Sequence, residues 1–174
     1  MKLVGYAAVF NSPSVDLGDF VELIEPGAFQ RTLRDGHAIY GVHHHNYADI
    51  LGSTRSGSLR LAEDRQGLHF EIDLPETTLG RDIHALVARG DLAHMSFSFL
   101  VNGAAGERWR ELSNGLFERT ILDAHLYEIS TVANPAYPMT KVSARSQDNQ
   151  GCDSTARRNR MLKRYMATNL SVVK

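Results

Sequence analysis

Apolar and polar residues alternate along many short stretches of the chain, and the clearest of these is residues 93–99. There, apolar side chains alternate with His94, Ser96 and Ser98, which is the period of two expected of a strand with one buried face. The stretch therefore predicts a strand that presents two serine hydroxyls on its polar side. Comparable patterns predict further strands at residues 3–10, 20–24, 38–43, 58–61, 68–74, 109–112, 117–122 and 124–132.

Two other stretches have helical spacing. The first begins at Pro26, which suits the first turn of a helix, and ends at Gly36. In the second, Thr77 or Thr78 caps the start, and apolar residues follow at helical intervals until Gly90. Many short strands with two helices predict an α+β fold that is rich in β-structure. We expect a closed or nearly closed barrel of mostly antiparallel strands with flanking helices.

Length and composition are those of one ordinary domain. The chain has 174 residues, of which 43% are hydrophobic and 22% are charged, so it is long enough to bury a sizeable core. No apolar run approaches the length of a membrane span, and the first residues alternate like a strand, so we expect an intracellular protein. The single cysteine, Cys152, excludes a disulfide framework and a multi-cysteine metal site within the chain.

Charge is distributed unevenly along the chain. Residues 1–144 contain 12 Lys and Arg against 18 Asp and Glu, whereas residues 145–174 contain 7 against 2. We therefore predict a domain at residues 1–145, followed by a polar linker and basic tail at residues 146–174. Apolar residues around Tyr165 would form one face of a short basic helix, which is as compatible with partner binding as with a solvated terminus. Nucleic-acid binding is not expected, because the tail offers few aromatic side chains for stacking.

The run of His43, His44 and His45 is the first candidate for chemistry. If the run continues a strand, His43 and His45 point the same way. Two such histidines are half of a metal site, but zinc requires three or four ligands and no other histidine or carboxylate has a matching short spacing. We therefore expect neither a metal nor another cofactor. A histidine acting as general base is the better interpretation, because imidazole titrates near neutral pH.

Ser96 is the second candidate, and it needs a base, because a hydroxyl is a poor nucleophile until its proton is removed. The histidines available for this role are His45, His84, His94 and His125. His94 and Ser96 lie on the same predicted strand, where base and nucleophile rarely meet, so a partner from another strand or loop is favoured. The Gly-x-Ser-x-Gly motif is absent, which argues against an α/β-hydrolase and against an esterase.

Two further parts of such a site are less well defined by the residues. A third side chain commonly orients the base, and Asp123, His125 and Glu128 are the candidates on a late strand. Acyl transfer also requires donors for the oxyanion. The residues do not identify these donors, although Gly52 and the region of Arg55 lie near the histidine run in the chain.

Several segments, taken in order, resemble a known family. They are Glu25-Pro26-Gly27-Ala28-Phe29, His45, Leu51-Gly52-Ser53-Thr54, residues 57–61, residues 67–68, Arg89-Gly90-Asp91, Met95-Ser96-Phe97-Ser98-Phe99 and residues 126–137. Together they resemble the tailed-phage prohead (capsid maturation) serine proteases over about residues 5–145. The resemblance implies a fold similar to that of the herpesvirus assembly protease.

The same resemblance implies roles for individual residues. Ser96 matches the family serine and His45 the family histidine, so a serine endopeptidase with Ser96 as nucleophile and His45 as general base is implied. Glu128 stands in a late segment of the family and is implied as the third member, with Asp123 or His125 as alternatives.

Substrates and location are also implied by the resemblance. The scaffolding protein, or the scaffold-like N-terminal segment of the major capsid protein, would be cut inside the assembling prohead in the host cytoplasm. The resemblance also implies that the protease cuts its own chain, which would make the basic tail a removable targeting segment. A homo-oligomer is compatible with this interpretation. The alternative from another class is a non-catalytic capsid assembly or scaffolding module with the same fold. The presence of both Ser96 and His45 favours the protease.

Overall fold

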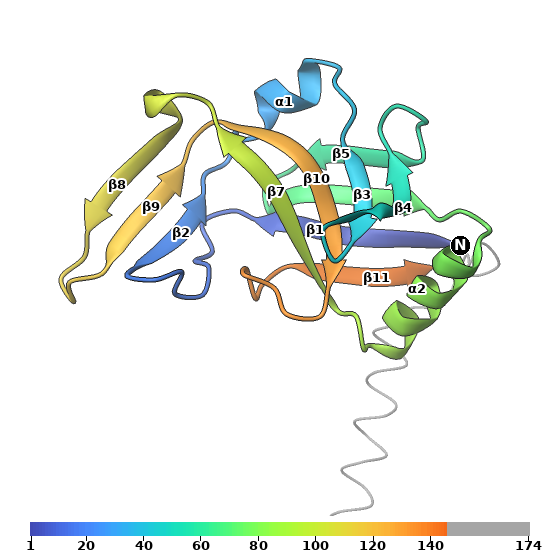
Figure 1. Ribbon diagram of the computed structural model, residues 1–174. Helices are drawn as coiled ribbons and strands as arrows, with labels where there is room; N and C mark the ends of the chain where they lie inside the picture. The colour runs from blue at the N-terminus through green and yellow to red at the C-terminus, as the bar shows by residue number, and fades with distance from the viewer. Residues whose placement is uncertain (146–174) are drawn as a thin grey trace, which may run out of the picture.

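The computed structural model describes residues 1–145, so the linker and tail predicted at residues 146–174 lie outside the described residues. Strands dominate this part of the chain (Figure 1). Their bounds are β1 (Lys2–Val9), β2 (Phe20–Ile24), β3 (Tyr40–His43), β4 (Asn46–Ser53), β5 (Leu59–Glu63), β6 (Gly67–Asp73), β7 (His94–Val101), β8 (Glu107–Glu111), β9 (Phe117–Ile121), β10 (Ala124–Val132) and β11 (Lys141–Arg145). The helical elements are α1 (Gln30–Arg34), α2 (Thr78–Arg89) and the 3₁₀ helix η1 (Ala104–Gly106).

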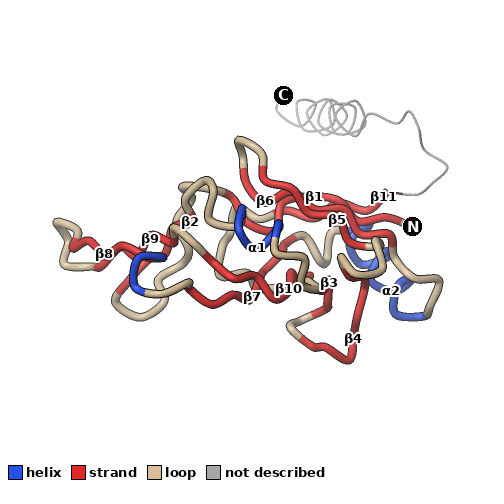
Figure 2. The backbone as a smooth tube through the Cα atoms, turned by 90° about the horizontal axis from the view of Figure 1, so that it is seen from above, coloured by secondary structure: helices blue, strands red, loops and turns tan. Residues whose placement is uncertain are grey.

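The described strands form three sheets. The first has the order β11-β1-β6-β5, the second β4-β3-β10-β7 and the third β2-β9-β8. The first two sheets lie against each other, and the third extends from one end of the molecule (Figures 1 and 2). Pairing is antiparallel except between β3 and β10 and between β2 and β9. Consequently β10 is an interior strand, enclosed between β3 and β7.

The core lies between the first two sheets. Phe70 of the first sheet and Met95 and Ile129 of the second are fully buried in one apolar cluster. The sheets approach closely at β3, where a Cβ atom on Gly41 would lie 2.8 Å from Cδ1 of Ile72. Burial of apolar surface on both sheets is the main stabilising term of such a fold, and it holds β3 and β10 in place.

Helix α2 matches its prediction. The Thr77 hydroxyl accepts a hydrogen bond from the backbone N–H of Gly80 at 3.1 Å, which is a normal N-terminal cap. Gly90 follows the last turn with a φ of 95°, the left-handed conformation that ends many helices. The capped start and the glycine end are therefore both confirmed.

Helix α1 is shorter than predicted. The expectation of a helix from Pro26 to Gly36 is wrong at its start, because α1 spans only Gln30–Arg34. Gly27 has a φ of 97°, which interrupts helical geometry, and the backbone N–H of Phe29 donates to the Glu63 carboxylate at 2.8 Å. The tertiary contact with β5 thus replaces the first helical turn that Pro26 suggested.

The predicted fold class is confirmed in its main features. The described residues form a β-rich α+β structure of mostly antiparallel strands with flanking helices. The strands are divided among three sheets, so residues 1–145 do not form one closed barrel. Within the same residues, no helix has both the length and the apolar character that crossing a bilayer requires.

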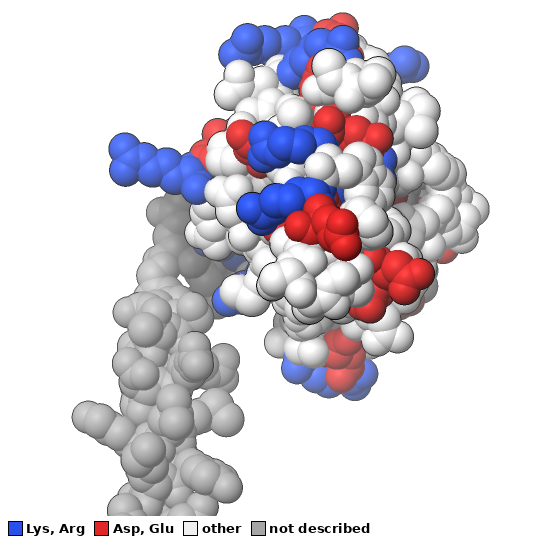
Figure 3. Space-filling view, turned by 90° about the vertical axis from the view of Figure 1, so that its left-hand side faces the viewer, with Lys and Arg blue, Asp and Glu red and all other residues white. Residues whose placement is uncertain are grey.

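The third sheet carries charges of both signs on its end of the molecule. Figure 3 shows basic and acidic side chains intermixed on this face. Two of the ion pairs on this sheet join Arg110 to Glu118 at 2.8 Å and Arg119 to Glu107 at 2.6 Å. This face therefore lacks the one-sign field that attracts nucleic-acid phosphates.

We expect Phe70→Ala to lower the free energy of unfolding by about 3–5 kcal/mol, because it removes a fully buried ring from between the two sheets. Urea denaturation measures this change. Leu100→Ala is the matched control, since Leu100 is 61% exposed and its loss should change stability by less than about 0.5 kcal/mol. Equal effects of the two substitutions would contradict the assignment of the core.

Candidate active site

Strand β10 lies between β7, which carries Ser96, and the turn that joins β3 to β4. Ser130 of β10 lies directly opposite Ser96 of β7 in the antiparallel register. Such partners share a face of the sheet, with Cβ atoms about 4.5–5.5 Å apart. Glu128 is two residues before Ser130, so its side chain emerges on that face as well. Ser130 is buried and Ser96 is partly exposed, which leaves the Ser96 hydroxyl open to solvent.

The turn between β3 and β4 consists of only two residues, His44 and His45. Both have positive φ angles, 49° and 59°, as in the type I′ turns that join hairpin strands. The turn is held against β10 by two backbone donors: the N–H of His44 bonds the Thr131 carbonyl at 3.0 Å, and that of His45 bonds the Ser130 hydroxyl at 2.8 Å. His45 and Ser96 therefore flank the same residue of β10.

The turn overturns one prediction about the histidine run. His43 and His45 were expected to point the same way, and this is wrong, because His45 lies in the turn and not on a continuing strand. Nδ1 of His43 is 2.9 Å from the Thr131 hydroxyl, whereas Nδ1 of His45 is 2.7 Å from Glu128. Thr131 and Glu128 are three residues apart on β10, so they lie on opposite faces of the sheet.

The hydrogen bond between His45 and Glu128 is the central contact of the site. Nδ1 of His45 donates to Oε1 of Glu128, and Nε2 is thereby left as the proton acceptor of the neutral ring. Glu128 is 0% exposed, whereas the His45 side chain is 46% exposed. Burial raises the pKa of Glu128, and its second oxygen, Oε2, has no hydrogen-bond partner among residues 1–145. The pair thus combines a buried carboxylate with an accessible imidazole.

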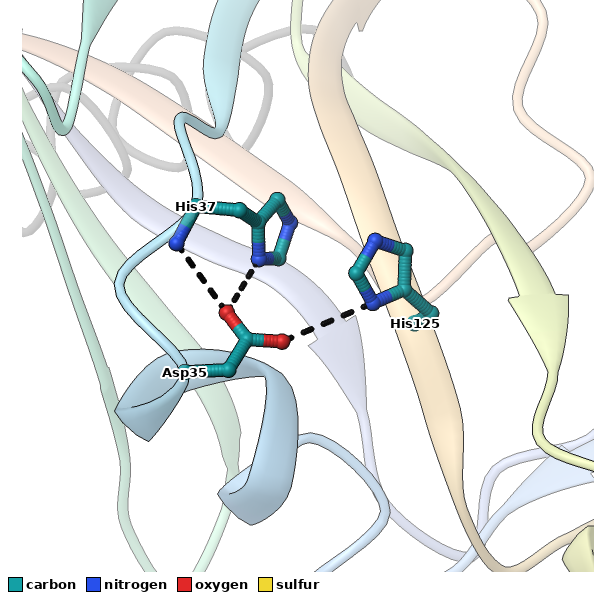
Figure 4. Close-up of side chains that lie close together, drawn as sticks. All are labelled: Asp35, His37 and His125. Atoms are coloured by element: carbon teal, nitrogen blue, oxygen red, sulfur yellow. Dashed lines mark hydrogen bonds and ion pairs between the residues drawn. The ribbon is translucent and has the colours of Figure 1, made fainter.

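Among the three candidates for the orienting residue, only Glu128 contacts His45. The carboxylate of Asp123 instead accepts a hydrogen bond from Asn102 at 2.8 Å and pairs with Arg31 at 3.2 Å. His125 faces the carboxylate of Asp35 at the end of α1 (Figure 4). Of the three side chains, Glu128 is thus the one that the structure places against His45.

The other histidines proposed as a base have different partners. Nδ1 of His94 donates to the Thr140 carbonyl at 3.0 Å, which directs its ring toward the β10–β11 connection. Nε2 of His84, on α2, donates to the Arg145 carbonyl at 3.4 Å.

Gly52 has a packing role in this structure. It lies near the far end of β4 from the turn, paired with Gly41 of β3. A Cβ atom at Gly52 would lie 3.1 Å from Cγ2 of Ile72, so the glycine allows β4 to approach β6. Arg55 follows β4 at this same end. Closeness in the chain to the histidine run therefore does not bring either residue to the His45–Glu128 pair.

Ser130 is a site residue that the sequence analysis did not single out. Its hydroxyl supports the backbone of His45, and its position lies directly opposite Ser96. The sequence could have pointed to Ser130 through its two-residue spacing from Glu128, because this spacing places both side chains on one face of a strand. Its partner in β7 could not be read from that spacing, because register between distant strands is a tertiary property.

Comparisons with known proteins give one matching family and several similar solved structures. The family model described as caudovirus prohead serine protease matches residues 1–154. Among solved structures, the chain is similar to varicella-zoster virus protease and to KSHV protease in complex with a hexapeptide phosphonate inhibitor. Both are 14% identical and match 81% of this chain, with TM-scores of 0.45 and 0.48. The matches cover 62% and 63% of those chains, so this chain spans less than two thirds of either. No curated protein matches.

A serine beside a histidine–carboxylate pair is an arrangement used by serine hydrolases. The chain belongs to the caudovirus prohead serine protease family, whose model spans most of its length.

We expect His44→Asn to raise the free energy of unfolding by roughly 0.5–1 kcal/mol. A left-handed conformation costs an ordinary L-residue about 1–2 kcal/mol, and asparagine tolerates it better. His44→Val is the opposing control and should destabilise the protein, because β-branched residues avoid positive φ. Thermal or urea unfolding compares the two. If valine stabilises the protein more than asparagine, the turn does not have this conformation in solution.

The buried carboxylate predicts a pH-dependent difference between wild type and Glu128→Gln. Because burial raises the pKa of Glu128, the folded state holds this proton more tightly than the unfolded state. Wild type therefore loses stability as pH rises from the unfolded pKa through the folded pKa, by about 1.4 kcal/mol for each unit between them. Glutamine has no such proton, so Glu128→Gln should gain stability relative to wild type between about pH 4 and about pH 7. Urea denaturation at both pH values checks this. A constant or falling difference would contradict the raised pKa.

Proposed function

We propose that the protein is a serine endopeptidase in which Ser96 attacks a peptide carbonyl carbon and His45 accepts the hydroxyl proton at Nε2. His45 then donates this proton to the leaving amine, and water hydrolyses the acyl-enzyme by the same route. Glu128 holds the imidazole through Nδ1. The observation that carries the proposal is the 2.7 Å hydrogen bond between His45 and Glu128, beside the strand that bears Ser96.

The charge arrangement supports His45 as the base. A bond from Nδ1 to Glu128 fixes the tautomer in which Nε2 is unprotonated, so a proton can be accepted there. When His45 becomes an imidazolium, the buried carboxylate next to it is poorly screened by water and stabilises the new positive charge. Glu128 would therefore act both by orienting His45 and by favouring its charged form.

We take Ser96 as the nucleophile because, of the two serines on this face of β7, it is the one that matches the family serine. Ser96 lies opposite Ser130, whose hydroxyl holds the backbone of His45 at 2.8 Å. Ser98 lies opposite Glu128, one pleat further along β7, and is more exposed than Ser96. No hydrogen bond joins Ser96 to His45 among residues 1–145, and in free enzymes this contact commonly shortens only when substrate binds.

The substrates we propose are the scaffolding protein or a scaffold-like N-terminal segment of the major capsid protein. Family membership and its capsid-related substrates support this choice. Cleavage would take place inside the assembling prohead in the host cytoplasm, with the protease also cutting its own chain.

Co-expression with the cognate capsid and scaffold proteins tests the proposal. Intact-mass analysis of the particles should show defined cleavage products with wild type. Ser96→Ala and His45→Gln should lower product formation by roughly a thousandfold or more, because each removes a part of one catalytic unit. Ser98→Ala is the matched control on the same strand and face, and it should keep the products.

Two results would overturn the proposal. Products that persist in Ser96→Ala would remove Ser96 from the mechanism. Particles that assemble without any cleavage in wild type would favour the alternative of a non-catalytic assembly or scaffolding module with this fold.

A further inference from the structure

A second group of titratable side chains lies outside the His45–Glu128 pair. Asp35 follows α1, His37 lies in the loop to β3, and His125 is the second residue of β10 (Figure 4). One ligand atom of each lies within 4.8 Å of the other two. Nδ1 of His125 is 3.6 Å from Oδ2 of Asp35, and Nδ1 of His37 contacts Oδ1 of the same carboxylate. None of these side chains has a part in the proposed proteolysis.

One nitrogen of the His37 ring is already hydrogen-bonded to the backbone, as in many metal-binding histidines. Nε2 of His37 donates to the carbonyl of Leu126 at 2.7 Å, because a carbonyl can only accept. The backbone N–H of His37 donates to Oδ1 of Asp35 at 3.1 Å, which fixes the carboxylate as well. Metal-bound histidines usually donate their second N–H to a carbonyl or carboxylate in this manner. Nδ1 of His37 is thus the atom left to bind an ion.

The spacing of the donor atoms suits a small transition-metal ion. Zinc bonds of about 2.0–2.2 Å in a tetrahedral site place neighbouring ligand atoms about 3.3 Å apart. The separation of 3.6 Å between His125 Nδ1 and the carboxylate is close to this value. His37 lies nearer to the carboxylate and would move away from it as the ion replaces the hydrogen between them. The two rings, now stacked at 4.1 Å and 23°, would open to direct both nitrogen atoms at the ion.

We propose that Asp35, His37 and His125 bind a divalent transition-metal ion, with Zn²⁺ as the best match. Two imidazole nitrogens and one carboxylate oxygen suit zinc, whereas calcium and magnesium prefer oxygen ligands throughout. The fourth position of the ion is open to water, because all three side chains are partly exposed.

The proposed ion would stabilise the strand that carries Glu128. It would tie the loop after α1 to the start of β10, three residues before Glu128 and next to the register shift between Leu126 and Glu128. Its effect is therefore expected on stability. Sequence spacing does not reveal this group, because Asp35 and His37 are far from His125 in the chain.

Zinc titration of the metal-stripped full chain tests the proposal. Calorimetry should show one Zn²⁺ bound per chain, with a rise in the unfolding temperature. His37→Gln and His125→Gln should each weaken binding by at least about tenfold. Even the loss of a residue that only hydrogen-bonds to a metal ligand typically weakens metal affinity by about this factor. His84→Gln is the control, because His84 is a partly exposed histidine on α2 that is not part of this group, so its loss should leave binding unchanged.

A measurement on the wild-type chain locates the ion without any substitution. Paramagnetic Co²⁺ should broaden the amide signals around Leu126 before those around His44 in nuclear magnetic resonance spectra. Broadening centred on His44, binding that survives both His37→Gln and His125→Gln, or no binding at submillimolar Zn²⁺ would each overturn the proposal.

Discussion

The burial of Glu128 is the constraint on which the rest of the site depends. A carboxylate removed from water needs a hydrogen-bonding partner, and His45 supplies one at 2.7 Å. Glu128 can be buried because β10 is an interior strand between β3 and β7, and its sheet packs on the β11-β1-β6-β5 sheet through the shared apolar core. The electrostatics of the site therefore follow from the order of the strands.

His45, the hydrogen-bonding partner of Glu128, lies in the β3–β4 turn, whose backbone is strained. Two successive non-glycine residues with positive φ are unfavourable, and they persist where the surroundings hold them in place. Here Thr131 and Ser130 of β10 hold the backbone of His44 and His45. The strained turn thus lowers local backbone stability, and it positions the imidazole of His45 over Glu128. A more relaxed turn with glycine at position 45 would have no imidazole over Glu128.

Local patterns predicted the elements better than the contacts between them. The alternation around Ser96 and the Thr77 cap of α2 correspond to elements in the structure, since each depends on a few adjacent residues. The two-residue turn and the short α1 could not be foreseen, because tertiary contacts override local preference there. Likewise, choosing Glu128 over Asp123 requires the pairing of β3 with β10, which joins residues more than eighty positions apart.

Labelling with a fluorophosphonate, followed by peptide mapping of the protease in assembled particles, is the most direct test of the central claim. A fluorophosphonate reacts with a serine whose proton is taken by a neighbouring base. The account predicts one adduct, on Ser96, that persists in Ser98→Ala and is lost in His45→Gln. An adduct on a different residue, or equal labelling of the Ser96→Ala chain, would contradict it.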